Sequence, residues 1–263
     1  KNSRKNIWLV IMAACLSLSG VASFFIYKYL RQKHVIASQK ANLLKQKLLL
    51  SQMNPHFIFN SLNAIQSYIF GQNGMQASIY LSQFAQLMRM ILDFSRKDYI
   101  SLESELEFLK LYMELQQLRI EHKFTYTLVT DEHEEPESVM VPPMLAQPFI
   151  ENAIEHGFFQ RKGKGHIIVS IKREGHFLRY SIEDNGIGLE SSKKLKEQNA
   201  KHESLAIKIT NERLKTLYSI HNGRPAINMT DKAVLDNTTS GVRVTFKIPY
   251  KELSSTYDQS NHH

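Results

Sequence analysis

The sequence lacks the residues from which disulfide scaffolds and cysteine-rich zinc sites are built. Cys15 is the only cysteine among 263 residues, so neither an internal disulfide nor a cluster of thiolate metal ligands can form. With 43% hydrophobic and 22% charged residues, the composition is typical of a globular chain and excludes a disordered or collagen-like one. The length accommodates one large domain or two small ones.

Acidic residues are absent from the first fifty positions, which hold nine of the 33 Lys and Arg residues. The rest of the chain carries 24 basic and 25 acidic residues and is therefore close to neutral. A nucleic-acid-binding protein would have its basic surface on the folded part. The net charge of +8 thus arises in the N-terminal segment. We expect a membrane as partner and no direct contact with nucleic acid.

A run of twenty-one residues without a charge extends from Ile7 to Tyr27. A helix of this length crosses the roughly 30 Å hydrocarbon core of a bilayer, so residues 7–27 are predicted to be a transmembrane helix. The larger basic cluster follows the run, and the positive-inside rule places the residues after about 29 in the cytoplasm. A signal peptide is the alternative, although the run is long and ends at Lys28 and Arg31 in place of small residues.

Beyond this run, the hydrophobic pattern predicts helices as far as about residue 120. One long helix is expected over 32–70, followed by a turn at 71–74 and a second helix over about 75–95. A third helix is expected to start at Ser101 as N-cap, with Glu103 and Glu105 near its positive end. Its expected core face consists of apolar residues: Leu102, Leu106, Leu109, Met113 and Ile120. The pattern favours a helix pair or bundle over a strict coiled coil.

After Arg119 the pattern changes to alternating strands and shorter helices. Strands are expected over residues 124–129, 166–172, 177–182, 226–229 and 242–248, and helices over residues 142–157 and about 204–221. The second and third of these strands flank Glu174 and Gly175 and are predicted to form a hairpin. The sequence therefore predicts a helical module followed by an α/β sandwich.

The segment QMNPHFIFN, from Gln52 to Asn60, places Pro55 inside the expected long helix. A proline in a helix interior costs about 3 kcal/mol, and such a cost calls for a compensating reason. A kink that aims His56 at solvent would provide one, because a neutral imidazole is a good nucleophile near pH 7. The alternative is a kinked helix with an incidental surface histidine.

Two further segments carry residues suited to binding. In EDNGIGL, Asp184 ends an expected strand and is followed by two glycines, which allow close approach of a ligand, although a tight turn alone would explain them. In PFIENAIEHG, Asn152, Glu155 and His156 share one helix face. An amide oxygen beside a carboxylate suits Mg²⁺, although a solvated helix face is the alternative.

Taken in order, four motifs resemble those of the LytS-like branch of sensor histidine kinases: NPHFIFNSLN, PPMLAQPFIENAIEHG, EDNGIGL and NERLKTLY. The resemblance extends from about residue 45 to residue 250. It implies a dimeric helical phosphotransfer module followed by a GHKL-type ATP-binding domain. It also implies that a histidine is autophosphorylated from Mg-ATP and passes the phosphoryl group to an aspartate of a response regulator.

The resemblance implies a membrane-anchored α plus α/β fold. We expect four parts: residues 1–30 as transmembrane anchor, 31–120 as helical dimerisation and histidine phosphotransfer module, 121–252 as GHKL-type ATP-binding domain and 253–263 as tail. The expected cofactors are ATP and Mg²⁺. The expected partners are a second copy of the chain and a cytoplasmic response regulator of the LytTR DNA-binding type. The expected location is the bacterial cytoplasmic membrane.

Carried over to this sequence, the resemblance assigns His56 as phosphoacceptor, Asn152 as magnesium ligand and Asp184 as the residue that reads the adenine amino group. No acid follows His56, so Asn60, one turn on, is expected to orient water or the imidazole. The other residues expected at the nucleotide site are Glu151, His156, Gly186, Gly188, Ser204 and Lys208.

The sequence departs from the family pattern near the phosphates. Glu155 stands where the family has a basic residue, and the second glycine box is missing around Ser204. Ser204 as N-cap would leave helix amides free for phosphate, and Lys208 would supply positive charge. The polar stretch 190–203 is expected to be a mobile lid or a plain surface loop. These departures keep a non-catalytic, ATP-binding scaffold open as an alternative, beside a GHKL ATPase or a Ser/Thr protein kinase.

Overall fold

The computed structural model describes residues 12, 19–20, 23–33, 35–36, 55–131, 135–158, 163–189, 205–219, 227–235 and 239–253. The chain divides into two compact units, residues 1–48 and 49–263. In the first unit, the described residues are helical. No helix within the described residues is long and apolar enough to cross a membrane. Much of the predicted span 7–27 lies outside those residues.

The second unit begins with three helices, α2 (Pro55–Phe70), α3 (Gly74–Phe94) and α4 (Leu102–Arg119). The predicted second and third helices and the turn between the first two are confirmed. The last part of the expected long helix over 32–70 is observed as α2. Residues 37–54 of that expected helix lie outside the described part. Pro55 is the first residue of α2 as described, so a kink there stays a prediction.

Polar side chains cap two of these helices. The Ser101 hydroxyl accepts a hydrogen bond from the Ser104 amide at 3.1 Å, as expected for the N-cap of α4. At the start of α3, the Asn73 side chain accepts from the Gln76 amide at 3.3 Å. Both bonds satisfy amides that have no partner inside the helix, and they set where each helix begins.

A five-stranded mixed sheet follows, in the order β2-β4-β5-β7-β6. Its strands are β2 (Phe124–Thr130), β4 (Gly165–Glu174), β5 (Phe177–Asp184), β6 (Asn228–Asp231) and β7 (Val242–Pro249). β2 and β4 are parallel, and the other neighbours are antiparallel. A small second sheet joins β1 (Ile100–Ser101), β3 (Val139–Val141) and β8 (Lys251–Glu252). The predicted hairpin is β4–β5.

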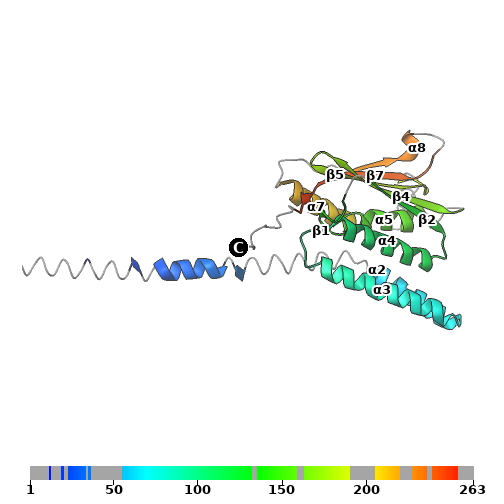
Figure 1. The fold of residues 1–263 in the computed structure, drawn as a ribbon, viewed down its shortest axis with the longest axis horizontal. Coiled ribbons are helices and arrows are strands. Elements are labelled where there is room, and N and C mark those ends of the chain that lie inside the picture. The colour runs from blue at the N-terminus through cyan, green and yellow to red at the C-terminus, as the bar shows by residue number, and fades with distance from the viewer. Residues whose placement is uncertain are drawn as a thin grey trace, which may run out of the picture. The chain divides into compact units, whose positions relative to one another are not determined.

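Helices cover one face of the large sheet (Figure 1). These are α4, α7 (Leu205–Ser219) and α5 (Gln147–Asn152), which continues as the π-helix η1 (Ala153–Gly157). The short α8 (Lys232–Leu235) follows β6. α2 and α3 pack against α4 on its side away from the sheet. The unit is therefore a helical layer on an α/β sandwich, as the sequence predicted.

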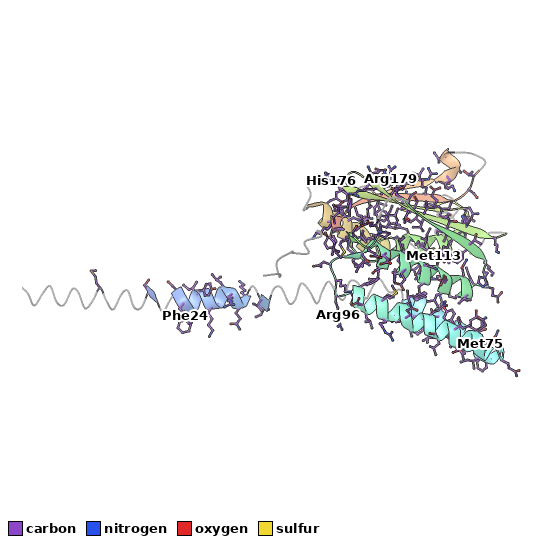
Figure 2. All side chains as sticks on the ribbon, in the orientation of Figure 1. Phe24, Met75, Arg96, Met113, His176 and Arg179 are labelled. Carbon is purple, nitrogen blue, oxygen red and sulfur yellow. The ribbon has the colours of Figure 1, made fainter. Side chains whose placement is uncertain are left out.

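The position of α4 between two layers changes its core face. Phe108, Leu111 and Tyr112 are buried, whereas the expected core residues Leu106 and Ile120 are only partly buried. A helix that packs on two opposite sides has no single apolar stripe. The hydrophobic periodicity of its sequence therefore predicts fewer buried residues than the structure has. Met113 of α4 is fully buried, whereas Met75 at the start of α3 is exposed (Figure 2).

Two other boundaries differ from expectation. The helix predicted from residue 142 begins at Gln147, because Pro142 to Ala146 form a turn in which Met144 has a left-handed φ of 56°. The strand expected over 226–229 is observed over 228–231. On the outer face of the sheet, Glu174 pairs with Arg179 at 3.0 Å and with Lys247 at 2.7 Å, so this face is charged.

Candidate active site

Asp184 lies at the end of β5 and is 6% exposed. Its Oδ1 accepts hydrogen bonds from the Gly186 amide at 2.7 Å and the Val242 amide at 3.3 Å. These two bonds fix the carboxylate and join the end of β5 to the start of β7. No hydrogen bond from a described residue reaches Oδ2, which leaves that oxygen available as an acceptor for a ligand.

Burial raises the pKa of the Asp184 carboxyl above its ordinary value. The amides of Gly186 and Val242 and the charge of Lys232 lower the pKa, whereas the charge of Asp231 raises it. The net direction is upward because desolvation of the charged form is the largest effect. The hydrogen bonds and Lys232 thus partly offset the cost of a negative charge in a buried position.

Gly186 brings the turn after β5 against the end of η1. A Cβ on Gly186 would lie 2.5 Å from the Gly157 Cα, so the two backbones approach too closely for any side chain. The Ile187 amide donates to the Gly157 carbonyl at 3.2 Å. The segments EDNGIGL and PFIENAIEHG, found separately in the sequence, are therefore in direct backbone contact.

Gly241 is required for a different reason. Its φ is 119°, and a Cβ there would lie 2.1 Å from the Asp184 carbonyl oxygen. The Gly241 carbonyl accepts from the Lys232 amide at 2.8 Å. The residue before β7 thus allows the backbones of three segments to meet beside Asp184.

Asp231, at the end of β6, holds the loop that contains Gly188. Its Oδ2 accepts from the Leu189 amide at 2.8 Å, and its Oδ1 accepts from the Ala233 amide at 3.1 Å. A Cβ on Gly188 would lie 2.8 Å from the same carboxylate. Gly186 and Gly188 therefore each lie where a neighbouring segment comes too close for a side chain in the turn after Asp184.

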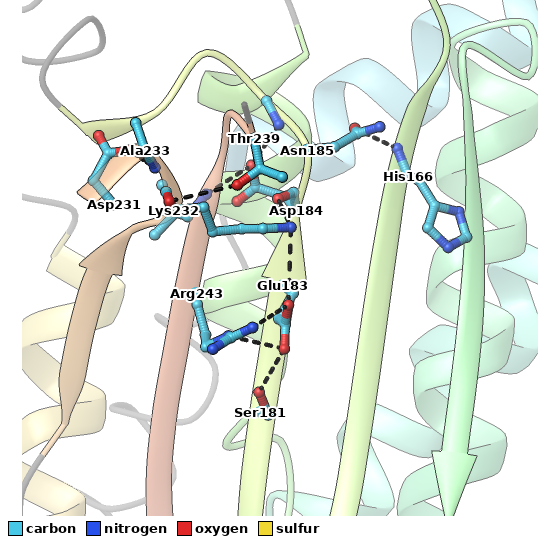
Figure 3. A network of polar contacts seen from close by, with 12 residues as sticks. His166, Ser181, Glu183, Asp184, Asn185, Asp231, Lys232, Ala233, Thr239 and Arg243 are labelled. Carbon is cyan, nitrogen blue, oxygen red and sulfur yellow. Dashed lines mark hydrogen bonds and ion pairs between the residues drawn. The ribbon is translucent and has the colours of Figure 1, made fainter. Parts of the chain in front are cut away.

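Glu183 connects the same strand ends on the opposite side of the sheet from Asp184, as alternation along a strand requires (Figure 3). Its carboxylate pairs with Arg243 at 2.9 Å and lies 3.8 Å from the Lys232 ammonium. Lys232 also donates to the Asp184 carbonyl at 3.4 Å. The strand ends that carry Asp184 are therefore joined by charge as well as by backbone bonds.

Asn152 ends α5 and is partly buried. Its Nδ2 donates to the Pro148 carbonyl at 2.8 Å, and no hydrogen bond from a described residue reaches its Oδ1. Glu151, beside it, is buried, and Glu155 is partly buried. An oriented amide oxygen fits a magnesium ion that takes its other ligands from phosphate and water. Within the described residues, no three His, Cys, Asp or Glu side chains gather as a metal site.

Tyr112 on α4 packs against α2 and is influenced by charges on α5 and η1. Its ring centroid lies 5.4 Å from that of Phe57, the residue that follows His56, and its hydroxyl accepts from Gln116 Nε2 at 2.9 Å. Burial raises the pKa of the Tyr112 phenol well above its ordinary value, and the charges of Glu151 and Glu155 raise it further. α4 thus contacts α2, the helix that contains His56, and Tyr112 lies within the electrostatic influence of Glu151 on α5.

Several expected site residues have no described side chain. His56 is the second residue of α2, His156 lies in η1 and Lys208 lies in α7, while Ser204 and the stretch 190–203 lie outside the described part. Asn60 lies on α2, one turn after His56, and is partly buried. The roles assigned to these residues therefore stay predictions.

Sequence reasoning missed Asp231, Tyr112 and Glu105. Asp231 could have been noticed as an acid that precedes a short helix, where it caps Ala233. Glu105 was interpreted through the helix dipole alone, although it lies three residues after Leu102, on that helix's core face. No sequence signal distinguishes Tyr112 from an ordinary core aromatic residue.

Known proteins that are similar to this chain include a histidine kinase family and LytS sensor proteins. Residues 44–124 match the family model described as histidine kinase. The chain is 32% identical over 218 residues to the sensor protein LytS of Streptococcus mutans, covering 81% of this chain and 35% of the relative. For the sensor histidine kinase/phosphatase LytS of Staphylococcus aureus the identity is 33% over 225 residues, with 82% and 36% covered. The chain is LytS-like.

The LytS-like chain spans about a third of the length of these two relatives. Among solved structures, it is similar to the histidine kinase domain of the Erythrobacter litoralis EL346 blue-light activated histidine kinase, with a TM-score of 0.42, 15% identity, and 80% of this chain and 94% of that chain covered. The catalytic domain of the histidine kinase ThkA gives a TM-score of 0.40 at 16% identity, covering 57% of this chain and 94% of that one.

The close approach at Gly241 gives a prediction about stability. Gly241→Ala adds a Cβ against the Asp184 carbonyl, whereas Gly163→Ala adds one in open space at a similar φ of 103°. We expect Gly163→Ala to cost about 1–2 kcal/mol from backbone strain and Gly241→Ala to cost roughly 2–3 kcal/mol more from the clash. Urea unfolding of both variants measures the difference, and equal losses would show that the Asp184 backbone can move aside.

Proposed function

We propose that this chain is the cytoplasmic output half of a membrane-anchored, homodimeric sensor histidine kinase. The observation that carries the proposal is the direct contact between the Asp184 turn and the helix of Asn152. Asp184 offers a fixed carboxylate oxygen, and Asn152 offers a fixed amide oxygen. A buried acceptor near a metal-binding oxygen suits a nucleotide, whose base carries an amino group and whose phosphates bind Mg²⁺.

In this proposal Asp184 accepts a hydrogen bond from the adenine amino group, and Gly186 and Gly188 form the surrounding turn. Asn152 would hold Mg²⁺ through Oδ1 together with phosphate oxygens, with Glu151 beside it, and the ion supplies charge neutralisation when bound. His156, Ser204 and Lys208 are proposed to face the phosphates. Phosphoryl transfer requires mainly positioning and charge stabilisation, which residues of this kind provide.

His56 is the proposed nucleophile. An imidazole nitrogen forms a bond to the γ-phosphorus as the bond from that phosphorus to the β–γ bridging oxygen breaks. ADP leaves with the electron pair, and the imidazole loses its ring proton. Asn60 is proposed to orient the imidazole or a water. The phosphoryl group then passes to an aspartate of a response regulator, which we propose to be of the LytTR type.

The proposed membrane anchor rests on the sequence of residues 7–27, twenty-one positions without a charge between basic flanks. The larger basic flank follows the run, which supports a cytoplasmic location for the rest of the chain. In one solved structure, the histidine kinase ThkA is in complex with the response regulator protein TrrA. We place this chain in the bacterial cytoplasmic membrane, where such a regulator can reach it from the cytoplasm.

The nucleophile is tested by incubating the full chain, in lipid nanodiscs, with γ-labelled Mg-ATP. We expect acid-labile, alkali-stable label on the parent and none on His56→Gln. His176→Gln is the matched control, because His176 is exposed in the β4–β5 turn (Figure 2), and it should label as the parent does. Label that persists on His56→Gln would refute the assignment. Bound ATP without label on the parent would favour the scaffold alternative.

Base recognition is tested by Asp184→Asn. The oxygen of the introduced carboxamide would keep the two amide bonds that Oδ1 makes now, so its NH₂ would face the adenine amino group, donor against donor. We expect affinity for ATP to fall about 10- to 100-fold, the loss typical of a hydrogen bond to a charged group. Isothermal titration calorimetry with ATP and GTP measures the two affinities. An unchanged affinity for ATP would show that Asp184 does not bind the adenine base.

The proposed dimer rests on the exposed apolar residues of α2 and α3. Exposed in the single chain are Phe59, Leu62, Ile69 and Phe70 of α2 and Met75, Ile79, Leu81 and Leu92 of α3. Apolar groups of this extent mark an interaction surface. A second copy presents the same surface and can cover it symmetrically.

A charge on this surface should separate the copies. We expect Phe59→Glu to weaken the dimer at least about tenfold, because Phe59 is 66% exposed and would be buried on association. Val234→Glu, at a residue 80% exposed on α8, is the control and should leave the dimer unchanged. Sedimentation velocity in detergent measures both, and an unchanged Phe59→Glu dimer would exclude this face.

A further inference from the structure

Glu105 is a fully buried carboxylate on the core side of α4. Its Oε2 accepts from the Met144 amide at 2.9 Å, and the Leu145 amide also donates to the carboxylate. Oε1 is buried, and no hydrogen bond from the described residues reaches it. Burying a charge is costly unless it is paired, so a carboxylate here calls for a role that an apolar residue could not take.

The turn that Glu105 holds is strained and leads directly into the candidate site. Met144 has a φ of 56°, which is uncommon for a residue with a side chain. Such a conformation persists only where its surroundings fix it, and the Glu105 carboxylate is the group that binds its amide. The Ala146 carbonyl then accepts from the Phe149 and Ile150 amides, so the turn sets the start of α5. Asn152 ends that helix.

Arg213 binds the same turn from α7. One of its guanidinium nitrogens donates to the Pro143 carbonyl at 2.8 Å. Burial lowers the pKa of the Arg213 guanidinium to about 10, and the charge of Glu105 opposes that fall. The turn is therefore held through the Pro143 carbonyl by the Arg213 guanidinium and through the Met144 amide by the Glu105 carboxyl group.

Glu105 and Arg213 belong to helices with different neighbours, because α4 packs against α2 and α7 packs on the sheet. α4 contacts α2 through Tyr112 and Phe57, with ring centroids 5.4 Å apart. α7 packs on the sheet, where the Tyr218 hydroxyl donates to the Lys247 carbonyl at 2.8 Å, and it also packs on α5. A displacement of α4 therefore has a direct path to α5 through Glu105 and the turn.

We propose that Glu105 and Arg213 are positioning residues that clamp the turn at residues 143–145, so that the position of α4 sets the affinity of the site for Mg-ATP. This inference rests on the proposed function and deepens it. The clamp acts on Asn152, the metal side of the site, because it holds the start of α5. It leaves Asp184 untouched, because the Asp184 carboxylate is fixed by amides of Gly186 and Val242.

The test uses the full chain in nanodiscs and the variants Glu105→Gln and Arg213→Met. Each removes one charge with little change in volume. Glu103→Gln on α4 and Lys215→Met on α7 are matched controls, because both side chains are exposed on the same helices. The double variant Glu105→Gln/Arg213→Met removes both charges together, so neither of the two is left buried opposite a neutralised one.

Three results are expected. Hydrogen exchange at the Met144 and Leu145 amides should be faster in both single variants than in the controls. Affinity for Mg-ATP should fall about 2- to 30-fold, the range of residues that couple sites without touching the ligand. Affinity for ADP without Mg²⁺ should change less, because that measurement does not use Asn152.

Stability against pH gives a readout that needs no nucleotide. Burial raises the pKa of Glu105 from 4.5 to about 7, although the amides and Arg213 lower it. The folded chain then binds a proton that the unfolded chain has lost, so stability falls as pH rises from about 4.5 to 7. Arg213 of α7 is the charged group facing Glu105, and the turn contributes amides. In Glu105→Gln the free energy of unfolding should not show this fall between about pH 4.5 and 7, whereas in Glu103→Gln it should.

The outcomes separate the clamp from the proposed function. If the parent binds and labels but both single variants exchange and bind as the controls do, the clamp is wrong and the kinase assignment stands. If Mg-ATP and Mg-free ADP weaken equally, the clamp supports the fold in general and does not position Asn152. A parent chain that binds no nucleotide at all would overturn both proposals.

Discussion

Burial of α4 on two opposite sides is the constraint on which the rest of residues 49–263 depends. One side of this helix packs on α2 and α3, and the other packs towards β2 and β3, so neither layer is complete without it. Tyr112 is buried against Phe57 on the first side. Glu105 holds the turn before α5 on the second. A helix with contacts on both sides cannot move towards one layer without leaving the other, because close-packed side chains do not deform continuously.

Local chemistry predicted much of the framework. Ser101 was identifiable as an N-cap because its hydroxyl can accept an amide bond, and Glu174–Gly175 as a hairpin turn because alternating strands flank it. The strands β1, β3 and β8 were missed, since runs of two or three residues carry no periodicity and form only when a distant segment pairs with them. The start of α5 was missed for a similar reason. The left-handed Met144 depends on Glu105, which is 39 residues away in sequence.

The candidate site was predictable where function follows from residue type and was not where it follows from tertiary contact. Asp184 and its glycines were singled out because an acid followed by two glycines directly after a strand allows close approach of a ligand, and because this segment belongs to a set of four ordered motifs. The backbone contact between Gly157 and Gly186 could not be predicted. It depends on two segments far apart in the sequence that approach so closely that Gly186 has no room for a Cβ. Asp231 and Gly241 belong to the same meeting of strand ends. Segments of β5, β6, β7 and η1 converge near Asp184, and the register of the strands together with the packing of η1 brings them there.

The buried charge of Glu105 separates two demands on this fold. If stability alone mattered, a well-packed apolar residue would serve as well or better, because desolvating a carboxylate and a guanidinium offsets much of their attraction. An apolar residue cannot bind the Met144 and Leu145 amides, and it would remove the charge of Glu105 that opposes the fall in the Arg213 pKa. Both bonds end on the one turn that leads from the helical layer into α5. The pair is therefore better explained by the geometry it imposes on the site than by the free energy of unfolding it contributes.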